Sequence, residues 1–172
     1  MSALNSSRLL IAQGLVSLLQ GVQNTVTSSN LYLAVKLGSF FDPSAYASGL
    51  CADVTFFQGK SGPAGSGGNL VGWRIEDAPV FVITTIADYE ADSTLAMTNT
   101  LTAMDMLMPL LHSHFQIPNP NAPSLPIASV YSLLEDQVDR ARAVRYPNGH
   151  VYYVWTTFAL CKQQYNVSLS LP

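Results

Sequence analysis

Charged residues are scarce in this 172-residue chain. Asp, Glu, Lys and Arg together make up 11% of it, against about a quarter of an average soluble protein. Hydrophobic residues make up 48%, so the composition excludes an intrinsically disordered chain, which carries much charge and little apolar surface. With so little charge to solvate its surface, we expect the folded chain to cover part of that surface with partner subunits.

Basic residues and cysteines are also few. Eight Lys and Arg against eleven Asp and Glu give a formal net charge of −3, which argues against a specific nucleic-acid surface. The two cysteines, Cys51 and Cys161, are too few for a disulfide framework. A single bridge between them stays open, but two buried thiols in a reducing compartment are favoured.

Long hydrophobic runs are absent from the sequence. No stretch reaches the roughly 20 apolar residues that span a bilayer. The most apolar segment, 4–19, is interrupted by Gln13 and Ser17 and is not followed by a clear small-residue cleavage site, so it does not fit a signal peptide. We therefore expect a soluble, unsecreted protein that does not contact a membrane, folded as a single domain over residues 1–172.

Hydrophobic periodicity predicts a helix and then two strands in the first third of the chain. Apolar residues recur at helical spacing over 4–22, which indicates a first helix that ends near Gly21. The segments 26–37 and 51–57 are predicted to be strands. Alternation places four apolar residues on the buried face of the first strand: Leu31, Leu33, Val35 and Leu37.

The middle of the chain predicts further strands and a second helix. Residues 70–75 are predicted to form a short strand, and 80–87, opened by Pro79, are apolar on both faces, as in a central strand covered on both sides. Asp92 or Ser93 is expected to cap the helix that follows, and Pro109 to kink or split it. The apolar stripe of this helix is predicted to be Met97, Leu101, Met104, Met108, Leu111 and Phe115.

Two loops and a closing hairpin complete the prediction. The Gly-rich segment 59–69 is expected to be a flexible loop, and the Pro-rich segment 116–126 an irregular surface connection. Residues 127–146 fit a helix in part, but Asn148-Gly149 is typical of a hairpin turn. We therefore expect 141–146 to pair with 151–160, with Trp155 in the core. The fold class is α+β, with a mixed or antiparallel sheet packed by an N-terminal and a central helix.

Two short segments resemble catalytic motifs only in part. Gly59-Lys60-Ser61 is similar to the end of a phosphate-binding loop, but Val54 stands where that motif needs its first glycine. Neither Ser61 nor Ser66 lies in the Gly-x-Ser-x-Gly pattern of a nucleophile elbow. We predict no catalytic or cofactor-binding residues, no cofactor, and no enzymatic activity.

The histidine and acidic groupings have structural explanations. His112 and His114 are two apart, and such side chains point in different directions on a helix, so we predict no metal site. Asp88, Glu90 and Asp92 precede a predicted helix, whose N-terminus favours carboxylates. A second mixed-charge group reads as a solvated surface or a subunit interface: Glu135, Asp136, Asp139, Arg140, Arg142 and Arg145.

The segment 145–158, Arg-Tyr-Pro-Asn-Gly-His-Val-Tyr-Tyr-Val-Trp-Thr-Thr-Phe, and the apolar helix 9–19 carry a resemblance to a known family. The first looks like the closing hairpin, and the second like the opening helix, of the tail terminator (tail completion, or neck) proteins of long-tailed bacteriophages. The order of predicted elements also resembles these small α+β proteins, in which a second helix packs on the sheet.

The resemblance implies a structural virion protein without catalysis or cofactor. It implies a homo-oligomeric ring, commonly a hexamer, at the head-proximal end of the tail, made in the host cytoplasm. The implied partners are further copies of the chain, the tail-tube protein and a head-completion or connector protein, with DNA passing through the ring. Another head-completion or tail-tube subunit remains an alternative, as does a small ligand-binding or enzymatic module.

Overall fold

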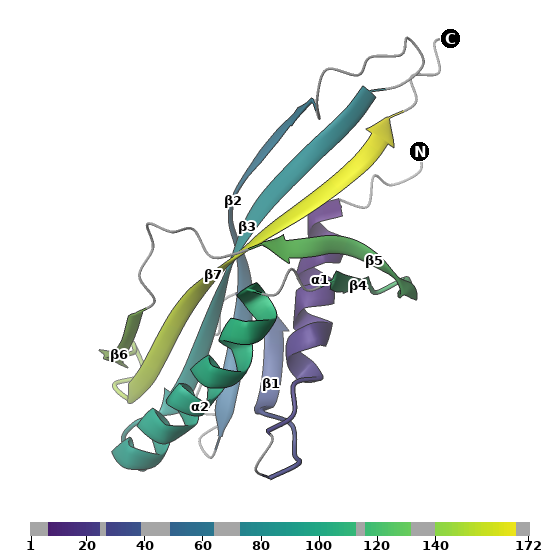
Figure 1. Ribbon diagram of the computed structural model, residues 1–172. Coiled ribbons are helices and arrows are strands. Elements are labelled where there is room, and N and C mark those ends of the chain that lie inside the picture. The colour runs from purple at the N-terminus through teal and green to yellow at the C-terminus, as the bar shows by residue number, and fades with distance from the viewer. Residues whose placement is uncertain are drawn as a thin grey trace.

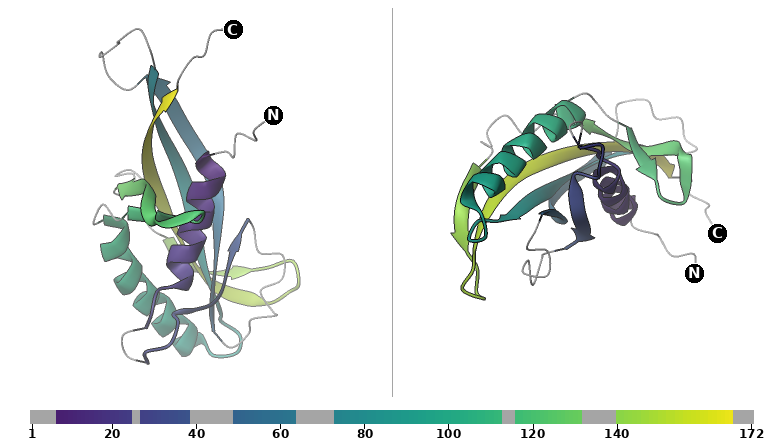
Figure 2. Two further views of the ribbon diagram at one scale, coloured as in Figure 1. Left: turned by 90° about the vertical axis from the view of Figure 1, so that its right-hand side faces the viewer. Right: turned by 90° about the horizontal axis from the view of Figure 1, so that it is seen from below.

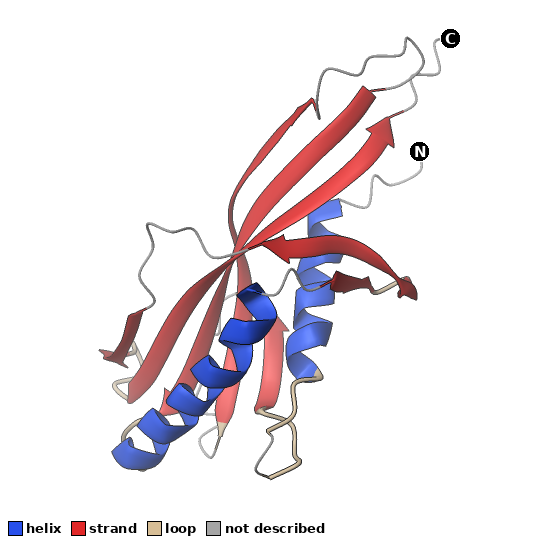
Figure 3. Cartoon of the chain, viewed as in Figure 1, coloured by secondary structure: helices blue, strands red, loops and turns tan. Residues whose placement is uncertain are grey.

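The computed structural model describes residues 7–24, 27–38, 49–63, 73–112, 116–131 and 140–167 (Figure 1). Two helices and a seven-stranded mixed sheet form an α+β fold, which confirms the predicted class (Figure 3). In chain order the elements are α1 (Ser7–Gln20), β1 (Tyr32–Leu37), β2 (Leu50–Pro63), β3 (Trp73–Asp88), α2 (Ser93–His112), β4 (Gln116–Asn119), β5 (Ala122–Tyr131), β6 (Arg140–Arg145) and β7 (Val151–Val167).

β3 is the central strand. The sheet order is β1-β2-β3-β7-β5-β4, and β6 also pairs with β7. Only β1 and β2 are parallel; the other pairs are antiparallel. The prediction of separate strands over 70–75 and 80–87 is wrong, because β3 is continuous from Trp73 through Pro79. Proline has no N–H to donate, and the ladder with β7 is interrupted only at Ala78 and Pro79.

The Gly-rich segment is not a loop in its first half, so the prediction of a flexible loop over 59–69 is wrong there. Residues 59–63 continue β2 and pair with β3 from Pro79 to Ile75; residues 64–69 lie outside the described part. Backbone pairing needs no side chains, so a long neighbouring strand can hold glycines in a ladder. Figures 1 and 2 show that β2, β3 and β7 extend together beyond the helices at one end of the molecule.

The main core lies between the two helices and one face of the sheet. Ile11 and Leu15 of α1 and Leu107 of α2 are buried in one cluster with Phe81 of β3 and Trp155 of β7. Alternation along β7 explains the position of Trp155, because successive side chains point to opposite faces. Trp155 has no exposed surface, which confirms it as a core residue.

A smaller cluster covers part of the opposite face of the sheet. Cys51, Ile86, Tyr152 and Val154 pack together there, and cross-strand pairs join Cys51 to Ile86 and Ile86 to Val154. Residues of β3 are therefore buried on both faces, as predicted for the strand over 80–87. On the helical side, the Tyr32 hydroxyl and Thr85 Oγ1, which are 2.9 Å apart, share a buried hydrogen bond.

α2 packs through a face that only partly agrees with the predicted stripe. Leu111 is buried, and Met104 and Met108 are partly buried against the core, as predicted. Met97 and Leu101 are 41% and 52% exposed, although the predicted stripe placed both in the core. The buried face consists of smaller residues on average: Ala96, Thr100, Ala103, Leu107 and Leu111. Small side chains allow the helix backbone to approach a sheet that already carries large ones such as Phe81 and Trp155. Position 115 lies outside the described residues.

The ends of α2 follow local rules. Asp92 Oδ1 accepts a hydrogen bond from the Leu95 N–H at 2.9 Å, which confirms the predicted cap. Of the two predicted effects of Pro109, a kink or a split, the split does not occur. The helix continues through this exposed residue to His112, because only the Pro109 N–H is lost from the helical ladder.

β1 departs from simple alternation. Leu31 and Val35 are buried as predicted, whereas Leu33 and Leu37 are 62% and 46% exposed, so the predicted buried face is right at two positions and wrong at the other two. The register with β2 shifts between Tyr32 and Ala34, and such a bulge moves the following side chains to the other face. The strand is also shorter than the predicted 26–37. Two large apolar side chains are consequently exposed on an outer strand.

The Pro-rich segment forms a hairpin, so the prediction of an irregular connection over 116–126 is wrong. β4 pairs with β5 despite register shifts on both sides of Pro118. Ile117 is fully buried and packs against α1 at Gly14, where an added Cβ would lie 2.6 Å from the Pro118 carbonyl oxygen. Gly14 therefore permits the close approach of α1 to β4.

The closing hairpin is confirmed. β6 pairs with β7 from Arg145–Val151 to Arg140–Thr156, close to the predicted pairing of 141–146 with 151–160. Gly149 has φ 87°, the left-handed conformation that favours glycine in such a turn. The helical alternative within 127–146 does not apply to 127–131 or to Arg140–Arg145, which are in strands; residues 132–139 lie outside the described part.

We expect Trp155→Ala to lower the free energy of unfolding by about 3–5 kcal/mol, since it removes a fully buried ring. Trp155→Phe should cost less, because it retains most of the apolar volume and the indole N–H has no hydrogen-bond partner within the described residues. Urea unfolding followed by circular dichroism measures both. Leu125→Ala, at a side chain 61% exposed, is the matched control. A Trp155→Ala midpoint equal to wild type would contradict the core assignment.

Candidate functional site

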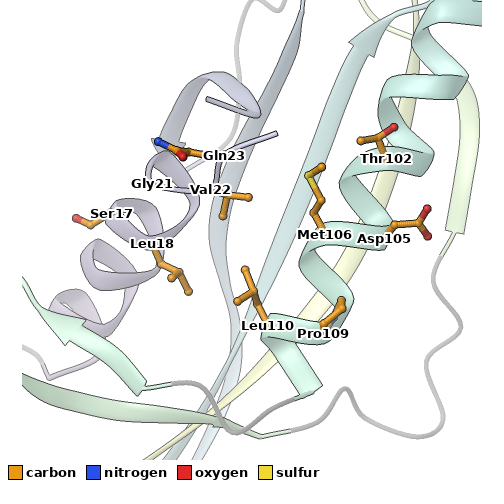
Figure 4. Close-up of a pocket in the computed structure, with 10 residues that line it drawn as sticks. All are labelled: Ser17, Leu18, Gly21, Val22, Gln23, Thr102, Asp105, Met106, Pro109 and Leu110. Carbon is orange, nitrogen blue, oxygen red and sulfur yellow. The ribbon is translucent and has the colours of Figure 1, made fainter. Parts of the chain in front are cut away.

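Two concavities open on the helical side of the sheet. The larger, which we call the inter-helix cleft, has a volume of about 940 Å³ and lies between the end of α1 and the second half of α2 (Figure 4). Figure 4 shows apolar side chains directed into it from both sides: Leu18, Val22, Met106 and Leu110. Each helix packs on the sheet, and the cleft is the space left between them.

The polar groups of the inter-helix cleft are sparse. Ser17, Gln23 and Thr102 offer hydroxyl and amide groups, and Asp105 is the single charged residue among the ten that line the cleft. Figure 4 shows the Asp105 carboxylate on the side of α2 turned away from α1. These lining residues do not include a pair of titratable groups suited to acid–base chemistry, and the side chains directed into the cleft are mainly apolar.

The smaller concavity, which we call the edge pocket, has a volume of about 370 Å³. It lies where the N-terminal half of α1 meets the end of β1 and the middle of β2. Gly38 closes it with φ 88° and donates its N–H to the Val54 carbonyl at 2.9 Å. Three of the lining side chains are large, apolar and between 44% and 46% exposed: Leu9, Leu37 and Phe56.

A bidentate ion pair flanks the edge pocket. Arg8 Nε donates to Asp77 Oδ2 at 2.9 Å, and Arg8 Nη2 to Asp77 Oδ1 at 2.7 Å. The Asp77 side chain is 3% exposed and that of Arg8 35%. The Arg8 guanidinium also lies over the Phe56 ring, 5.5 Å from its centroid. A Cβ at Gly59 would approach its Cζ to 3.2 Å, so this glycine leaves room for the guanidinium.

Burial is the main cause of the raised pKa values of both thiols and of two tyrosines. It raises the pKa of Cys51 to about 11 and that of Cys161 to about 12. Burial also raises the pKa of Tyr32, and, together with nearby Asp53, that of Tyr146. Both cysteines are buried and free, which confirms two buried thiols. A thiol that stays protonated at neutral pH is a poor nucleophile.

The acidic residues before α2 serve local structure. Asp88 Oδ1 accepts hydrogen bonds from the Glu90 and Ala91 N–H groups, and Asp92 caps the helix. Glu90 Oε2 lies 3.1 Å from His150 Nδ1 in the β6–β7 turn. The carboxylates therefore hold the strand-to-helix junction, as the structural interpretation of the sequence predicts.

The remaining candidate residues that the structure describes do not form a common site. Lys60 and Ser61 lie within β2 rather than before a helix, so the resemblance to a phosphate-binding loop fails. Arg142 is exposed, and Arg145 donates to the Gly149 carbonyl at 2.7 Å. His112 ends α2, while positions 66, 114, 135, 136 and 139 lie outside the described residues. Over the described ranges, no three His, Cys, Asp or Glu side chains are grouped to hold a metal.

Sequence patterns did not indicate the two concavities or the Arg8–Asp77 pair. The two partners are 69 positions apart, and no local pattern links an arginine in one element to an aspartate in a distant one. The edge pocket is likewise assembled from α1, β1, β2 and β3. The only sequence signal for an exposed apolar surface was the low share of charged residues.

No model of a known protein family matches the chain, and no curated protein is significantly similar to it. Neither helix of the described part is long and apolar enough to cross a membrane.

We expect Arg8→Ala to lower the free energy of unfolding by about 3 kcal/mol, because it leaves the buried Asp77 carboxylate without its ionic partner. Thermal and urea denaturation measure the loss. Arg145→Ala is the matched control: Arg145 is exposed and donates only to the backbone of its own hairpin, so its removal should cost about 0.5 kcal/mol or less. Equal stabilities of the two variants would show that the Arg8–Asp77 pair does not hold α1 to β3.

Alkaline pH should destabilise the protein through its buried thiols. In the unfolded chain a thiol has its ordinary pKa of 9.0, whereas folding raises it to about 11 for Cys51 and about 12 for Cys161. The unfolded state therefore loses these protons first, and stability falls as pH rises from 9 toward 12. Urea titrations across this range should show a shallower fall for the Cys51→Ala, Cys161→Ala double variant. If the free energy of unfolding falls equally steeply with pH in wild type and in the double variant, the raised thiol pKa values are contradicted.

Proposed function

We propose that the protein is a structural subunit of a long-tailed bacteriophage that forms a ring at the head-proximal end of the tail. In this proposal the ring ends growth of the tail tube and joins the tail to the head. The observation that carries the proposal is the presence of large exposed apolar side chains on separate elements, among them Leu37 on β1, Phe57 on β2 and Leu101 on α2. A subunit in a closed ring buries such surfaces against two neighbours.

The exposed apolar edge at strand β1 supports the proposal that the protein assembles with further subunits. β1 is the first strand in the sheet order and pairs only with β2 among the described strands. Soluble proteins usually protect such an edge with charges, prolines or a covering element. Here Leu33 and Leu37 are exposed beside one lysine, Lys36. Cover from a neighbouring subunit would remove this apolar edge from water.

The proposal includes the partners that the resemblance implies. Further copies of the chain complete the ring, commonly a hexamer; the tail-tube protein lies on one side and a head-completion or connector protein on the other. The protein is then located in the virion neck and made in the host cytoplasm. DNA passes through the ring without specific binding, and the role requires neither catalysis nor a cofactor.

The inter-helix cleft favours one rival function, a ligand-binding module. Its volume of about 940 Å³ is within the size range of small-molecule sites, roughly 300–1,000 Å³. Met106→Trp would fill this cleft with a larger side chain. If the ring proposal holds, the variant assembles like wild type; loss of a bound small molecule without loss of assembly would favour the rival function.

Electron microscopy and sedimentation test the ring proposal directly. We expect the purified protein to form closed rings alone or on the ends of tail tubes, and its addition to growing tubes to limit their length. Open polymers of the protein itself would instead indicate a tail-tube subunit, and binding to head connectors alone a head-completion subunit. A compact monomer at micromolar concentration with tail tubes present would contradict an assembly role.

A further inference from the structure

We propose that β2 accepts an extended segment of a partner protein as an additional strand beside residues 55–59, and that one aliphatic side chain of this segment enters the edge pocket. Two adjacent features point to such a segment: an edge of β2 that no described strand covers, and the apolar pocket beside it. This inference does not rest on the proposed ring, because the added strand comes from a protein other than the subunit itself.

The outer edge of β2 is paired over only part of its length. The parallel ladder with β1 ends at the pair Leu37–Val54, where Gly38 donates its N–H to the Val54 carbonyl. Gly38 has φ 88°, a left-handed conformation that ends the strand. β2 continues to Pro63 and stays paired with β3 on its other edge. Among the described strands, none pairs with the outer edge of β2 beyond Val54.

Backbone groups of β2 face outward at this open edge. Alternate residues of a strand direct their N–H and C=O groups to the same edge. The Val54 carbonyl is directed to the edge that β1 covers, since it accepts from Gly38. The register with β3 is regular as far as Phe56, so the N–H and C=O of Phe56 are directed to that same edge, beyond the end of β1. An extended chain placed alongside would satisfy them, as in strand addition to a sheet.

The edge pocket opens beside the same stretch of β2. It is lined by Val54, Thr55 and Phe56 of β2, Leu9 and Ala12 of α1, and Leu37 of β1, among others. Successive side chains of a strand point to opposite faces of the sheet. Every second side chain of an added strand is therefore directed to the helical side of the sheet, where α1 and the pocket lie. The volume of about 370 Å³ accommodates one large aliphatic side chain.

The lining of the pocket selects an uncharged side chain. Arg8 is the one charged residue among the lining residues, and its charge is compensated by the two hydrogen bonds to Asp77. A charged side chain in the pocket would lose hydration without gaining an ionic partner. An aliphatic one removes apolar surface from water on both sides of the contact, because Leu9, Leu37 and Phe56 are 44–46% exposed.

The two features together select a peptide segment from another protein. A small apolar molecule would fill the pocket but would leave the outward backbone groups of β2 without partners. The strand at the opposite end of the sheet, β4, has four residues and contains Pro118, which has no N–H to donate. It is poorly matched to this edge, which favours a partner protein over a second copy of the chain.

Three fluorescein-labelled peptides separate the contribution of the backbone from that of the pocket. The first has six threonines around a central leucine, with a lysine at each end for solubility. The second carries aspartate in place of the leucine, and the third is the leucine peptide with every peptide nitrogen methylated. Fluorescence anisotropy measures their affinities. We expect the leucine peptide to bind at least about tenfold more tightly than the aspartate peptide, and the methylated peptide not to bind.

Two variants of one strand place the peptide on the protein. Leu37→Glu adds a charge at the rim of the pocket and should weaken binding of the leucine peptide at least about tenfold. Leu33→Glu is the matched control, because Leu33 is also an exposed leucine of β1 but does not line the pocket; it should bind like wild type. Circular dichroism and thermal melting verify that both variants fold.

Amide hydrogen exchange followed by NMR tests strand addition itself. We expect the leucine peptide to slow exchange of the Phe56 N–H, which faces the open edge, and to leave that of Thr55, which faces β3, unchanged. Unchanged exchange at Phe56, equal binding of the leucine and methylated peptides, or no binding at millimolar concentration overturns the proposal. If the peptide instead dissociates wild-type oligomers in sedimentation, the edge belongs to a second copy and the assignment to a partner protein is wrong. The same sedimentation runs report ring formation separately.

Discussion

Pairing between β3 and β7 is the interaction on which the rest of the structure depends. It joins Trp73 to Val167 at one end and Asp88 to Tyr152 at the other. The outer edges of these two strands then receive β2 on one side and β5 and β6 on the other. α2 packs on one face of this pair and α1 on the neighbouring strands, whereas on the other face the described residues form a small cluster around Tyr152. Because the partners are far apart in sequence, this ladder is the non-local step in folding.

The Arg8–Asp77 ion pair connects the helical layer to the end of the sheet that extends beyond it. Asp77 lies in the N-terminal half of β3, and Arg8 in the first turn of α1. Glycine at position 59 leaves the guanidinium room to reach the carboxylate. The same contact orients α1 over β2, which forms the edge pocket. A polar contact between distant elements therefore shapes a partly apolar pocket.

The low share of charged residues explains why large apolar side chains are exposed on the surface. The composition required apolar residues to remain on the surface, since the core cannot hold all of them. The structure places these residues on the outer strand β1, at the rim of the edge pocket and at separate exposed positions of α2. Assembly into a ring would give them a function. The inter-helix cleft is a separate feature, lined by residues of both helices.

The sequence by itself determined the elements whose signals are local. Helical periodicity placed α1, Asp92 capped α2, Asn148-Gly149 set the β6–β7 turn, and alternation buried Trp155, because each depends on residues within one or two turns of chain. Only the tertiary structure decided which face of α2 is buried, where β1 bulges, and that Gly59 and Pro79 continue long strands. These outcomes depend on the neighbouring strand or helix: small residues pack where the sheet is already bulky, and a ladder partner overrides the local preference of glycine or proline. The sequence did not predict the two concavities, because each is formed by elements that are distant in the chain.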